Sequence, residues 1–583
     1  MRSFLLINIL IPFYLLGTVE YEVYFEGNIT HEVVSVLESV SQSVLLEKDP
    51  PSTRIALKRR AEADLPNLIH GLHSLGYYNA KVDLDIEFDL GEVIFTIDLG
   101  PVYPLVEFNI ELAPGHYIES LIDRLKLEYL GVVLGRPALP KKILDGEANL
   151  LVWLAEEGYP LAFIVDRKIQ ADQADKVIRV NIVVNPGLKV VFGPTKIVGL
   201  KTIYPSFIEK RIAWNKGGEY NPYLIAKTQY ALESSGLFSS ISIQQLDEVV
   251  KENQLPFEIQ VSEANHRTIG FGVSYNTQLG PGALVNWEHR NMRGRGEKLR
   301  FKGEVWRIKQ QGIFEYILPD FFTQGQELKW VAEVEKEKTE GFSEVFFKLS
   351  GILERRITDK LKFSFGLSYK HLFSSNSDNN RAFSLMKLPI QVKWNHVDRA
   401  LDPSCGATLN LKLVPTLQLM NTQFGYVINH TMVTGYYPLN EDKLILAFRG
   451  QIGTITGSER YTIPPPERFY AGSESTLRGY KYMTVSPLDD ENKPIGGRSL
   501  MVYSLETRIK LKQCLGWVFF YEIGNVYSKP VPQFHDKQLQ SIGTGFRYHT
   551  PVGPLRADIA FPLNKRPGVD RAFQVYLSIG QAF

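Results

Sequence analysis

The four residues Leu477-Arg478-Gly479-Tyr480 place a guanidinium among apolar and aromatic neighbours, in a loop that runs from Tyr461 to Gly497. A compact domain rarely carries so long an irregular loop unless the loop is functional or disordered. If this loop folds inward, Arg478 needs a carboxylate partner, because burying an unpaired charge is strongly unfavourable. The chemistry predicted here is an internal ion pair. The alternative is a solvated loop charge.

Candidate partners lie in the two alternating segments that follow the loop. Segment 499–509 places Glu506 on its polar face, and segment 517–525 places Glu522 there. We expect Glu522 to be the main partner, because Gly524 beside it leaves room for the loop. Upstream in the loop, Arg468, Phe469 and Gly472 are the residues expected to support it; these three belong to the run Arg468-Phe469-Tyr470-Ala471-Gly472.

The elements that position these residues alternate with period two from about Arg267 to Phe583. In the first segment, Thr268 to Tyr275, apolar residues alternate with small or polar ones, and the last segment, Phe573 to Phe583, does the same. About sixteen such segments fit in this half. Apolar-out, polar-in strands of about ten residues are typical of transmembrane β-barrels, in which no backbone edge is left in lipid. The alternative is a soluble all-β sandwich.

The first half predicts three copies of one unit with the order β-α-α-β-β. In each copy a helix ends at a glycine followed by apolar or aromatic residues, at Gly76, Gly158 and Gly236. Glycine supplies the left-handed conformation that ends many helices. For the first of these helices, Asp64 is the predicted N-cap, with Pro66 in the first turn. Each three-stranded sheet would leave edges that can accept an extended segment or serve as a docking arm.

The N-terminus predicts export. Arg2 is followed by an apolar run from Phe4 to Leu16, too short for a membrane-spanning helix but typical of a secretory signal peptide. A buried first strand is the alternative. The expected domains are a signal peptide at 1–18, repeats at 19–100, 101–187 and 188–264, and a barrel at 265–583.

Composition and motifs exclude several function classes. The net charge of +1 argues against an electrostatic nucleic-acid binder. The sequence holds no GxxxxGK[ST] phosphate loop and no catalytic triad in its usual motif context, so we expect no enzyme and no cofactor. His70 and His73 are spaced like metal ligands, but a solvated helix face is the expected explanation, and no metal site is predicted.

Taken together, these motifs resemble the BamA/TamA superfamily of outer-membrane assembly proteins. The resemblance rests on the Leu477-Arg478-Gly479-Tyr480 loop, Phe520-Tyr521-Glu522-Ile523-Gly524, Gly553-Pro554-Leu555-Arg556-Ala557-Asp558 and the terminal Phe583. The units would then be polypeptide-transport-associated (POTRA) domains, and three of them before a 16-stranded antiparallel transmembrane barrel look most like the TamA branch. The family usually has Asp where this chain has Glu522.

The resemblance implies a location and partners. The barrel would lie in the outer membrane of a Gram-negative bacterium, in contact with the lipid bilayer, with the POTRA domains in the periplasm. It would insert or translocate unfolded barrel and autotransporter clients, and a TamB-like partner anchored in the inner membrane would dock on the POTRA domains. The alternatives are a two-partner-type polypeptide secretion pore and a BamA-like general barrel insertase; a passive porin is a further rival, against which the repeats argue.

The expected mechanism is a lateral gate where the first strand meets the last. Glycine weakens a strand, and both strands contain it. Opening there would free the edge of the first strand as a template for a client strand, whatever the client's sequence. The residues assigned to this gate are Gly270, Phe271, Gly272, Tyr576, Gly580 and Phe583.

Overall fold

The computed structural model describes residues 18–115, 118–246, 253–376, 379–420, 423–440, 443–512, 514–550 and 553–579. The expected signal peptide, residues 1–18, lies outside these ranges except for Thr18. The described chain divides into two compact units. One comprises residues 1–196, 213–227 and 243–259, and the other 197–212, 228–242 and 260–583, so the third repeat contributes to both.

Each repeat forms a small sheet of three strands whose last strand lies in the middle, in the orders β1-β3-β2, β4-β6-β5 and β7-β9-β8. In the first two sheets the first strand runs parallel to the central one and the second runs antiparallel to it. Their bounds are β1 Glu22–Glu26, α1 His31–Val40, α2 Gln42–Leu45, α3 Arg54–Ser74, β2 Lys81–Glu87, β3 Glu92–Asp98, β4 Leu105–Leu112, α4 Glu119–Ile122, η1 Leu127–Leu130, α5 Pro140–Glu156, β5 Phe163–Asp172, β6 Val177–Asn185, β7 Val191–Val198, α6 Pro205–Glu209, α7 Pro222–Glu233, β8 Phe238–Gln245 and β9 Gln254–Glu263.

The three repeat glycines have the left-handed backbone that their position after a helix requires, with φ of 89° at Gly76, 98° at Gly158 and 67° at Gly236. The helix start predicted at Asp64 is wrong. Helix α3 begins ten residues earlier, at Arg54, where the Thr53 side chain accepts a hydrogen bond from the Ala56 N–H.

Asp64 caps a different helix. From the middle of α3, its carboxylate accepts hydrogen bonds from the backbone N–H groups of Gln42 and Ser43 at the start of α2, both at 2.8 Å. Capping residues satisfy N–H groups that have no partner inside the helix. The sequence pattern therefore identified a capping residue correctly and assigned it to the wrong helix.

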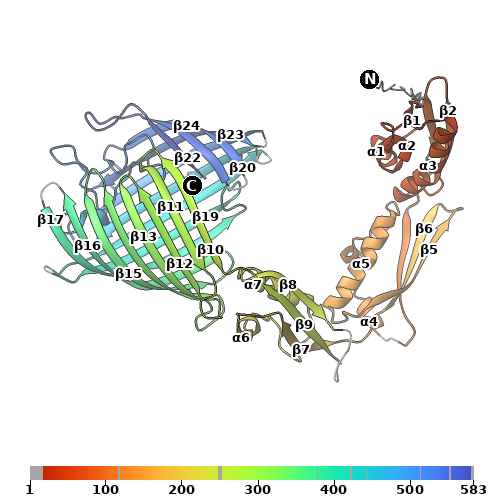
Figure 1. Ribbon diagram of the computed structural model, residues 1–583, viewed down its shortest axis with the longest axis horizontal. Coiled ribbons are helices and arrows are strands. Elements are labelled where there is room, and N and C mark those ends of the chain that lie inside the picture. The colour runs from red at the N-terminus through yellow and green to blue at the C-terminus, as the bar shows by residue number, and fades with distance from the viewer. Residues whose placement is uncertain are drawn as a thin grey trace, which may run out of the picture. The chain divides into compact units, whose positions relative to one another are not determined.

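The second half forms one antiparallel sheet in which consecutive strands pair from β10 to β26, and the sheet rolls into a barrel (Figure 1). The strands are β10 Arg267–Asn276, β11 Gly280–His289, β12 Lys298–Trp306, β13 Lys309–Leu318, β14 Gln326–Lys338, β15 Ser343–Arg356, β16 Leu361–Asn376, β17 Asn379–Lys387, β18 Ile390–Val397, β19 Gly406–Gln418, β20 Gly425–Asn440, β21 Leu444–Thr456, β22 Ser499–Lys512, β23 Leu515–Tyr527, β24 Leu539–Thr550, β25 Gly553–Pro562 and β26 Gln574–Ile579.

The sheet has seventeen labelled strands, whereas the sequence predicts sixteen, and one interrupted strand accounts for the difference. β16 pairs with β17 along 368–376 and with β18 along 361–365. Only Leu388 and Pro389 separate β17 from β18. Proline has no N–H to donate to a sheet ladder, so the strand is interrupted at Pro389. β17 and β18 occupy one position in the wall, and the prediction of a 16-stranded barrel is confirmed.

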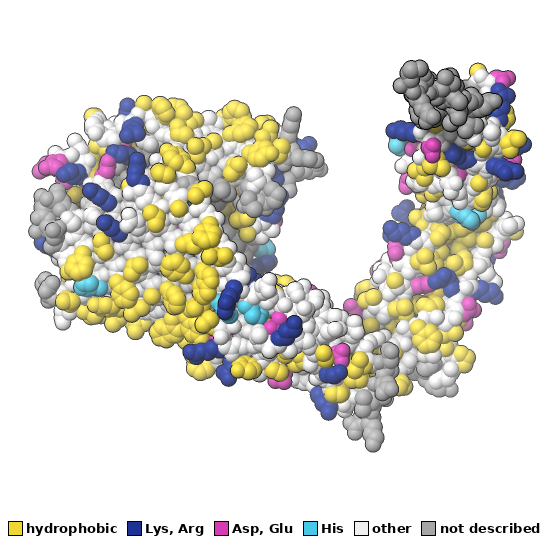
Figure 2. Space-filling model, in the orientation of Figure 1, with side chains coloured by type: hydrophobic (Ala, Val, Ile, Leu, Met, Phe, Trp, Pro, Cys, Tyr) yellow, Lys and Arg dark blue, Asp and Glu magenta, His cyan; other side chains and the backbone are white. Residues whose placement is uncertain are grey.

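The outer face of the barrel is apolar, as the alternation predicts. Ile269, Phe271, Val273 and Tyr275 of β10 are exposed, and Trp517, Phe519 and Tyr521 of β23 are exposed. Figure 2 shows hydrophobic side chains spread across this face. Water-soluble surfaces rarely carry apolar patches of this extent. Within the described residues, no helix is both long and apolar enough to cross a membrane.

Part of the third repeat packs against the turns at the end of the barrel where the chain enters. Tyr204 donates its backbone N–H to Gly294, and Arg211 forms an ion pair with Asp320 in the turn after β13. Gly294 has φ of 87°, and an added Cβ would lie 2.8 Å from the Tyr204 ring. The turn at residues 293–296 therefore needs glycine for its backbone and for its close contact with this segment.

Glu263, at the end of β9, holds the start of that segment. Its carboxylate accepts hydrogen bonds from the N–H groups of Lys201, Thr202 and Ile203 and from the Thr202 hydroxyl. Burial alone would raise the pKa of Glu263, but these hydrogen bonds outweigh it and lower the pKa from an ordinary 4.5 to about 2.

The lowered pKa of Glu263 predicts an acid-sensitive contact. A carboxyl group whose pKa falls on folding stabilises the fold above its unfolded pKa and loses that contribution as the pH drops through its folded pKa. We therefore expect hydrogen-exchange protection of the 201–203 amides to decline between pH 4.5 and 2. Glu263→Gln should remove the decline and lower the protection at pH 7. Glu258→Gln, on the same strand, should leave both unchanged; an identical pH profile in Glu263→Gln would contradict the assignment.

Candidate functional site

The loop between β21 and β22 packs onto the inner face of the barrel wall. Ala471, Leu477, Tyr480 and Val485 are buried against apolar residues of β22, β23 and β24. Gly479 has φ of 91°, and an added Cβ would lie 3.1–3.3 Å from wall atoms of Ser541, Phe561 and Pro562. The glycine of the motif therefore permits both the backbone turn and the close approach to the wall.

Arg478 is fully buried and reaches both predicted partners. Its Nη2 and Nε lie 2.7 and 3.0 Å from Glu522 Oε1, and its backbone N–H donates to Glu522 Oε2 at 2.5 Å. Nη2 also lies 2.7 Å from Glu506 Oε1, an ion pair without hydrogen-bond geometry. Glu522, whose side chain is longer than that of aspartate, accepts hydrogen bonds from both the side chain and the backbone of Arg478.

An aromatic ring and a third carboxylate complete the surroundings of the guanidinium. The ring of Phe520 lies 3.5 Å below the Arg478 guanidinium carbon, in cation–π geometry. Nη1 of Arg478 donates to Asp558 Oδ2 at 3.0 Å. The three acids come from β22, β23 and β25, so one loop residue connects three strands of the wall.

Sequence reasoning did not identify Asp558 as a partner of Arg478, or Arg449 as a partner of Glu522. Asp558 and Arg449 both occupy inward-facing positions on strands whose apolar and polar residues alternate. This alternation was the sequence signal that could have identified them. Arg449, on β21, donates to the Thr476 carbonyl at 3.0 Å and lies 3.4 Å from Glu522 Oε1. Arg547 and Arg556 contact Asp558 in turn. Buried charges are tolerated when they are paired and hydrogen-bonded in this way.

The last strand contacts the motif directly. The backbone N–H of Gly479 donates to the Tyr576 hydroxyl at 2.9 Å, and that hydroxyl lies 3.4 Å from the Tyr480 carbonyl oxygen. Gly270, Phe271 and Gly272 lie on β10, and the Phe271 side chain is exposed. Gly580 and Phe583, also assigned to the gate, lie outside the described residues.

The residues that were expected to support the loop make different kinds of contact. Arg468 donates to the carbonyls of Ile463 and Ile495 within the loop. The ring of Phe469 fills space that an added Cβ at Gly453 of β21 would occupy. Gly472 has φ of 93°. Gly524 does not make room for the loop as predicted, because an added Cβ there would meet the Met501 carbonyl of β22 at 2.3 Å.

Glu467 anchors the loop to the opposite part of the wall. It accepts a hydrogen bond from Lys370 of β16 at 3.1 Å and another from Lys387 of β17. Burial would raise the pKa of this loop carboxyl, but the two ammonium charges outweigh it and lower the pKa well below its usual range. The loop is therefore held by an anion, Glu467, near its start and by a cation, Arg478, near its middle.

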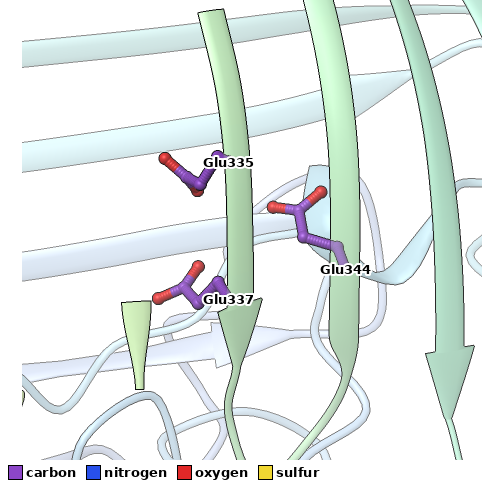
Figure 3. Close-up of side chains that lie close together, drawn as sticks. All are labelled: Glu335, Glu337 and Glu344. Carbon is purple, nitrogen blue, oxygen red and sulfur yellow. The ribbon is translucent and has the colours of Figure 1, made fainter. Parts of the chain in front are cut away.

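Three further carboxylates gather on the wall near this anchor (Figure 3). Oxygens of Glu335 and Glu337 on β14 and Glu344 on β15 lie within 4.8 Å of one another. Lys309 lies 2.9 Å from Glu335, Lys370 lies 3.2 Å from Glu344, and the Tyr482 hydroxyl donates to Glu337 at 3.2 Å. Two ammonium groups and a loop hydroxyl thus compensate the carboxylates from within the protein.

Comparisons with known proteins agree with this architecture. A family model described as the Omp85 superfamily domain matches residues 291–583, which is half of the chain. The outer membrane protein assembly factor BamA of Nitratidesulfovibrio vulgaris is 23% identical over 540 residues, covering 87% of this chain and 66% of that protein. BamA of Neorickettsia risticii is 20% identical over 384 residues, covering 62% and 51%. The chain thus spans two thirds or less of these relatives' length.

A crystal structure of BamA from Haemophilus ducreyi lacking POTRA domains 1–3 has the same fold, with a TM-score of 0.72 at 19% identity. It covers 81% of this chain and 99% of that one. The chain belongs to the Omp85 superfamily. It is an outer-membrane β-barrel preceded by periplasmic POTRA domains. The relatives named here are BamA proteins, so the expected resemblance is confirmed for the superfamily, while its TamA branch stays a prediction.

Removing the guanidinium should release the loop. Arg478→Ala leaves three carboxylates buried beside each other, and breaking a buried pair in this way costs about 3–5 kcal/mol. We expect hydrogen exchange across residues 461–497 to rise more than a hundredfold in the variant, measured on the protein in detergent micelles.

The matched control is Lys481→Ala in the same loop. Lys481 pairs with Glu340 at a solvent-exposed position, where an ion pair contributes about 1 kcal/mol at most. Its loop should exchange nearly as slowly as the wild type. Equal protection in Arg478→Ala and wild type would show that the buried pair does not hold the loop.

Proposed function

We propose that this protein is an outer-membrane protein assembly factor that inserts β-barrel clients through a lateral opening between β10 and β26. Its membership in the Omp85 superfamily and the assembly-factor name of its relatives support the activity. The clients are unfolded outer-membrane proteins, and the surrounding partner is the lipid bilayer. No reaction needs a cofactor, because the free energy comes from the folding of the client and the burial of its apolar face in lipid.

The observation that carries the proposal is the incomplete pairing of the seam. β10 and β26 approach within 8 Å between Cα atoms. Among the described residues, however, the hydrogen-bonded order of the sheet runs from β10 to β26 without joining them. Among the described residues, the edge of β10 therefore keeps backbone groups that an incoming strand can pair with, independently of its side chains.

The buried cluster beside the seam supports the same mechanism. Tyr576 of β26 contacts the loop motif, and Asp558 of the neighbouring β25 contacts Arg478. These contacts hold the last two strands to the buried motif of the loop. β10 and the turn after it contact the loop at the partly exposed Glu474 instead, through Asn276 and Gln278 at 3.3 and 3.4 Å. We infer that the β26 side of the opening is fixed and that the β10 side moves.

The choice of branch rests on the relatives and on the repeats. The names of the similar proteins favour a BamA-like general insertase, which the sequence analysis held as an alternative. The three POTRA-like sheets favour a TamA-like factor with autotransporter clients and a TamB-like inner-membrane partner. The two candidates differ in the range of clients that depend on them.

Depletion of the protein, followed by a proteomic census of the outer membrane, tests the function and separates the candidates. A general insertase predicts loss of most β-barrel proteins, each to less than about a third of its level. A TamA-like factor predicts loss confined to autotransporters, together with co-purification of a TamB-like protein on the POTRA domains. An unchanged outer-membrane proteome would contradict both candidates.

A reversible lock at the seam tests the lateral opening. Cys405 and Cys514 are free and would first be replaced by Ser. Gly270→Cys is the better of the two β10 positions, because an added Cβ there meets no atom within 4 Å, whereas Gly272 would meet Leu284 at 3.0 Å. Its partner would be placed at Ser578 of β26 or at Gly580. We expect the oxidised cystine to abolish client insertion and a reductant to restore it.

A cystine between Asn395 and Thr408 serves as the control. These residues face each other on the paired strands β18 and β19, so a crosslink there ties strands that do not separate. It should leave insertion unchanged. Full insertion by the protein locked at β10 and β26 would rule out the lateral opening without excluding assembly by another route.

A further inference from the structure

A cavity of about 550 Å³ lies inside the barrel, between the wall strands β14 to β20 and the loop residues Glu467 and Phe469. Cavities of this size typically hold small molecules. The contacts of the buried Arg478 lie elsewhere on the wall, on β22, β23 and β25. The cavity is therefore a separate feature of the lumen.

The charged side chains that line this cavity are mostly cationic. Five are lysines and two are glutamates: Lys329, Lys348, Lys370, Lys387, Lys412, Glu354 and Glu467. Four of the lysines lie within 3.2 Å of a carboxylate. Lys412 is exposed to the lumen, and among the described residues no carboxylate lies within 4.0 Å of it.

Lysines also face each other across neighbouring strands. Lys348 is directly opposite Lys370, and Lys362 is directly opposite Lys393. Like charges in this position destabilise a sheet. Lys362 and Lys393 share the inward face with the lining residues Ser364 and Gln391, two positions along the same strands, and within the described chain neither lies within 4.0 Å of a carboxylate. Carboxylates already compensate Lys348 and Lys370, so an anion bound in the neighbouring cavity would offset the charge of the pair Lys362 and Lys393.

One oxyanion of the protein is already bound to this wall. The Glu467 carboxylate is held between Lys370 and Lys387 at one edge of the cavity. Lys393 lies diagonally across from Lys412 on the paired strands β18 and β19, and Lys348 lines the same cavity as Lys412. Among the described residues, Glu333 pairs with Lys348, and Glu467 also acts on the charge of Lys412. The lumen therefore has room and charge for a second oxyanion beside Glu467.

We propose that this cavity is a phosphate-binding site, which takes a small phosphate-bearing molecule or a lipid headgroup of the same chemistry. Lysine is a common phosphate ligand because its ammonium is a compact charge with three donors. An extended acidic peptide fits less well, because the loop residues Glu467 and Phe469 cover the cavity. The site goes beyond the proposed assembly activity and does not depend on it.

The test is a titration with inorganic pyrophosphate of the full-length protein in nanodiscs of zwitterionic lipid. Binding is measured by isothermal titration calorimetry. Lys412→Gln and Lys393→Gln are the variants, because neither change leaves a carboxylate unpaired. Lys412→Gln should weaken pyrophosphate binding about tenfold, the effect of losing one charge-assisted contact, and Lys393→Gln, which removes a neighbouring charge outside the lining, should weaken it less. Lys510→Gln is the matched control: this lysine lies on β22 and does not line the cavity, and its change should leave the affinity as in wild type.

A second arm separates the two sources of phosphate. The same titration is repeated in nanodiscs that contain phosphatidic acid. If the headgroup enters the cavity, pyrophosphate binding weakens in the wild type and not in the double variant of Lys393 and Lys412. If pyrophosphate binds equally well in both lipids, the ligand is a free phosphate compound. Wild type that binds no pyrophosphate, or that binds it no better than the double variant does, would overturn the site.

Discussion

The buried charge of Arg478 is the interaction on which the interior of this barrel depends. A guanidinium in a water-poor lumen is stable only if carboxylates surround it and its donors are used. The chain meets this requirement with Glu506, Glu522 and Asp558, and with the face of Phe520. The strands that carry these residues must therefore stay in register, and the loop must stay folded inward.

The loop is attached to the wall at two distant places. Arg478 contacts β22, β23 and β25, whereas Glu467 contacts β16 and β17. A segment held at two places in this way braces the wall from within. The β10 edge contacts the loop at the partly exposed Glu474, which accepts a hydrogen bond from Asn276 at 3.3 Å, and in the described sheet its one hydrogen-bonded neighbour is β11. The contacts between the loop and the wall are thus distributed unevenly around the barrel.

Much of the fold follows from local patterns that the sequence displays openly. Period-two alternation determines which residues of β10 and β23 face lipid, and glycines such as Gly76 end helices for a backbone reason. The errors arise where a residue serves a distant element. Asp64 has the chemistry of a cap, but the helix that it caps is reached only through tertiary packing. Gly524 makes room for a neighbouring strand, and sequence alone does not say which neighbour a glycine accommodates.

The site was predictable to the same extent. A loop arginine needs an acid, and alternation restricts the choice to inward positions, which is how Glu522 and Glu506 were selected. Asp558 satisfies the same criterion, but its strand lies further along the chain, and the curvature that brings β25 to the loop is not visible in a linear pattern. The lysine-lined cavity was missed because its residues come from strands that are separate in sequence and meet only across the barrel wall.

The contact between Tyr576 and Gly479 has a consequence for how this protein is made. Tyr576 lies seven residues before the end of the chain as printed, and Asp558 lies on the preceding strand. Ribosomes synthesise these residues after the loop that they hold. Arg478 gains the Asp558 carboxylate, and Gly479 the Tyr576 hydroxyl, only once β25 and β26 have joined the wall, so the loop is fully seated at the last stage of barrel closure.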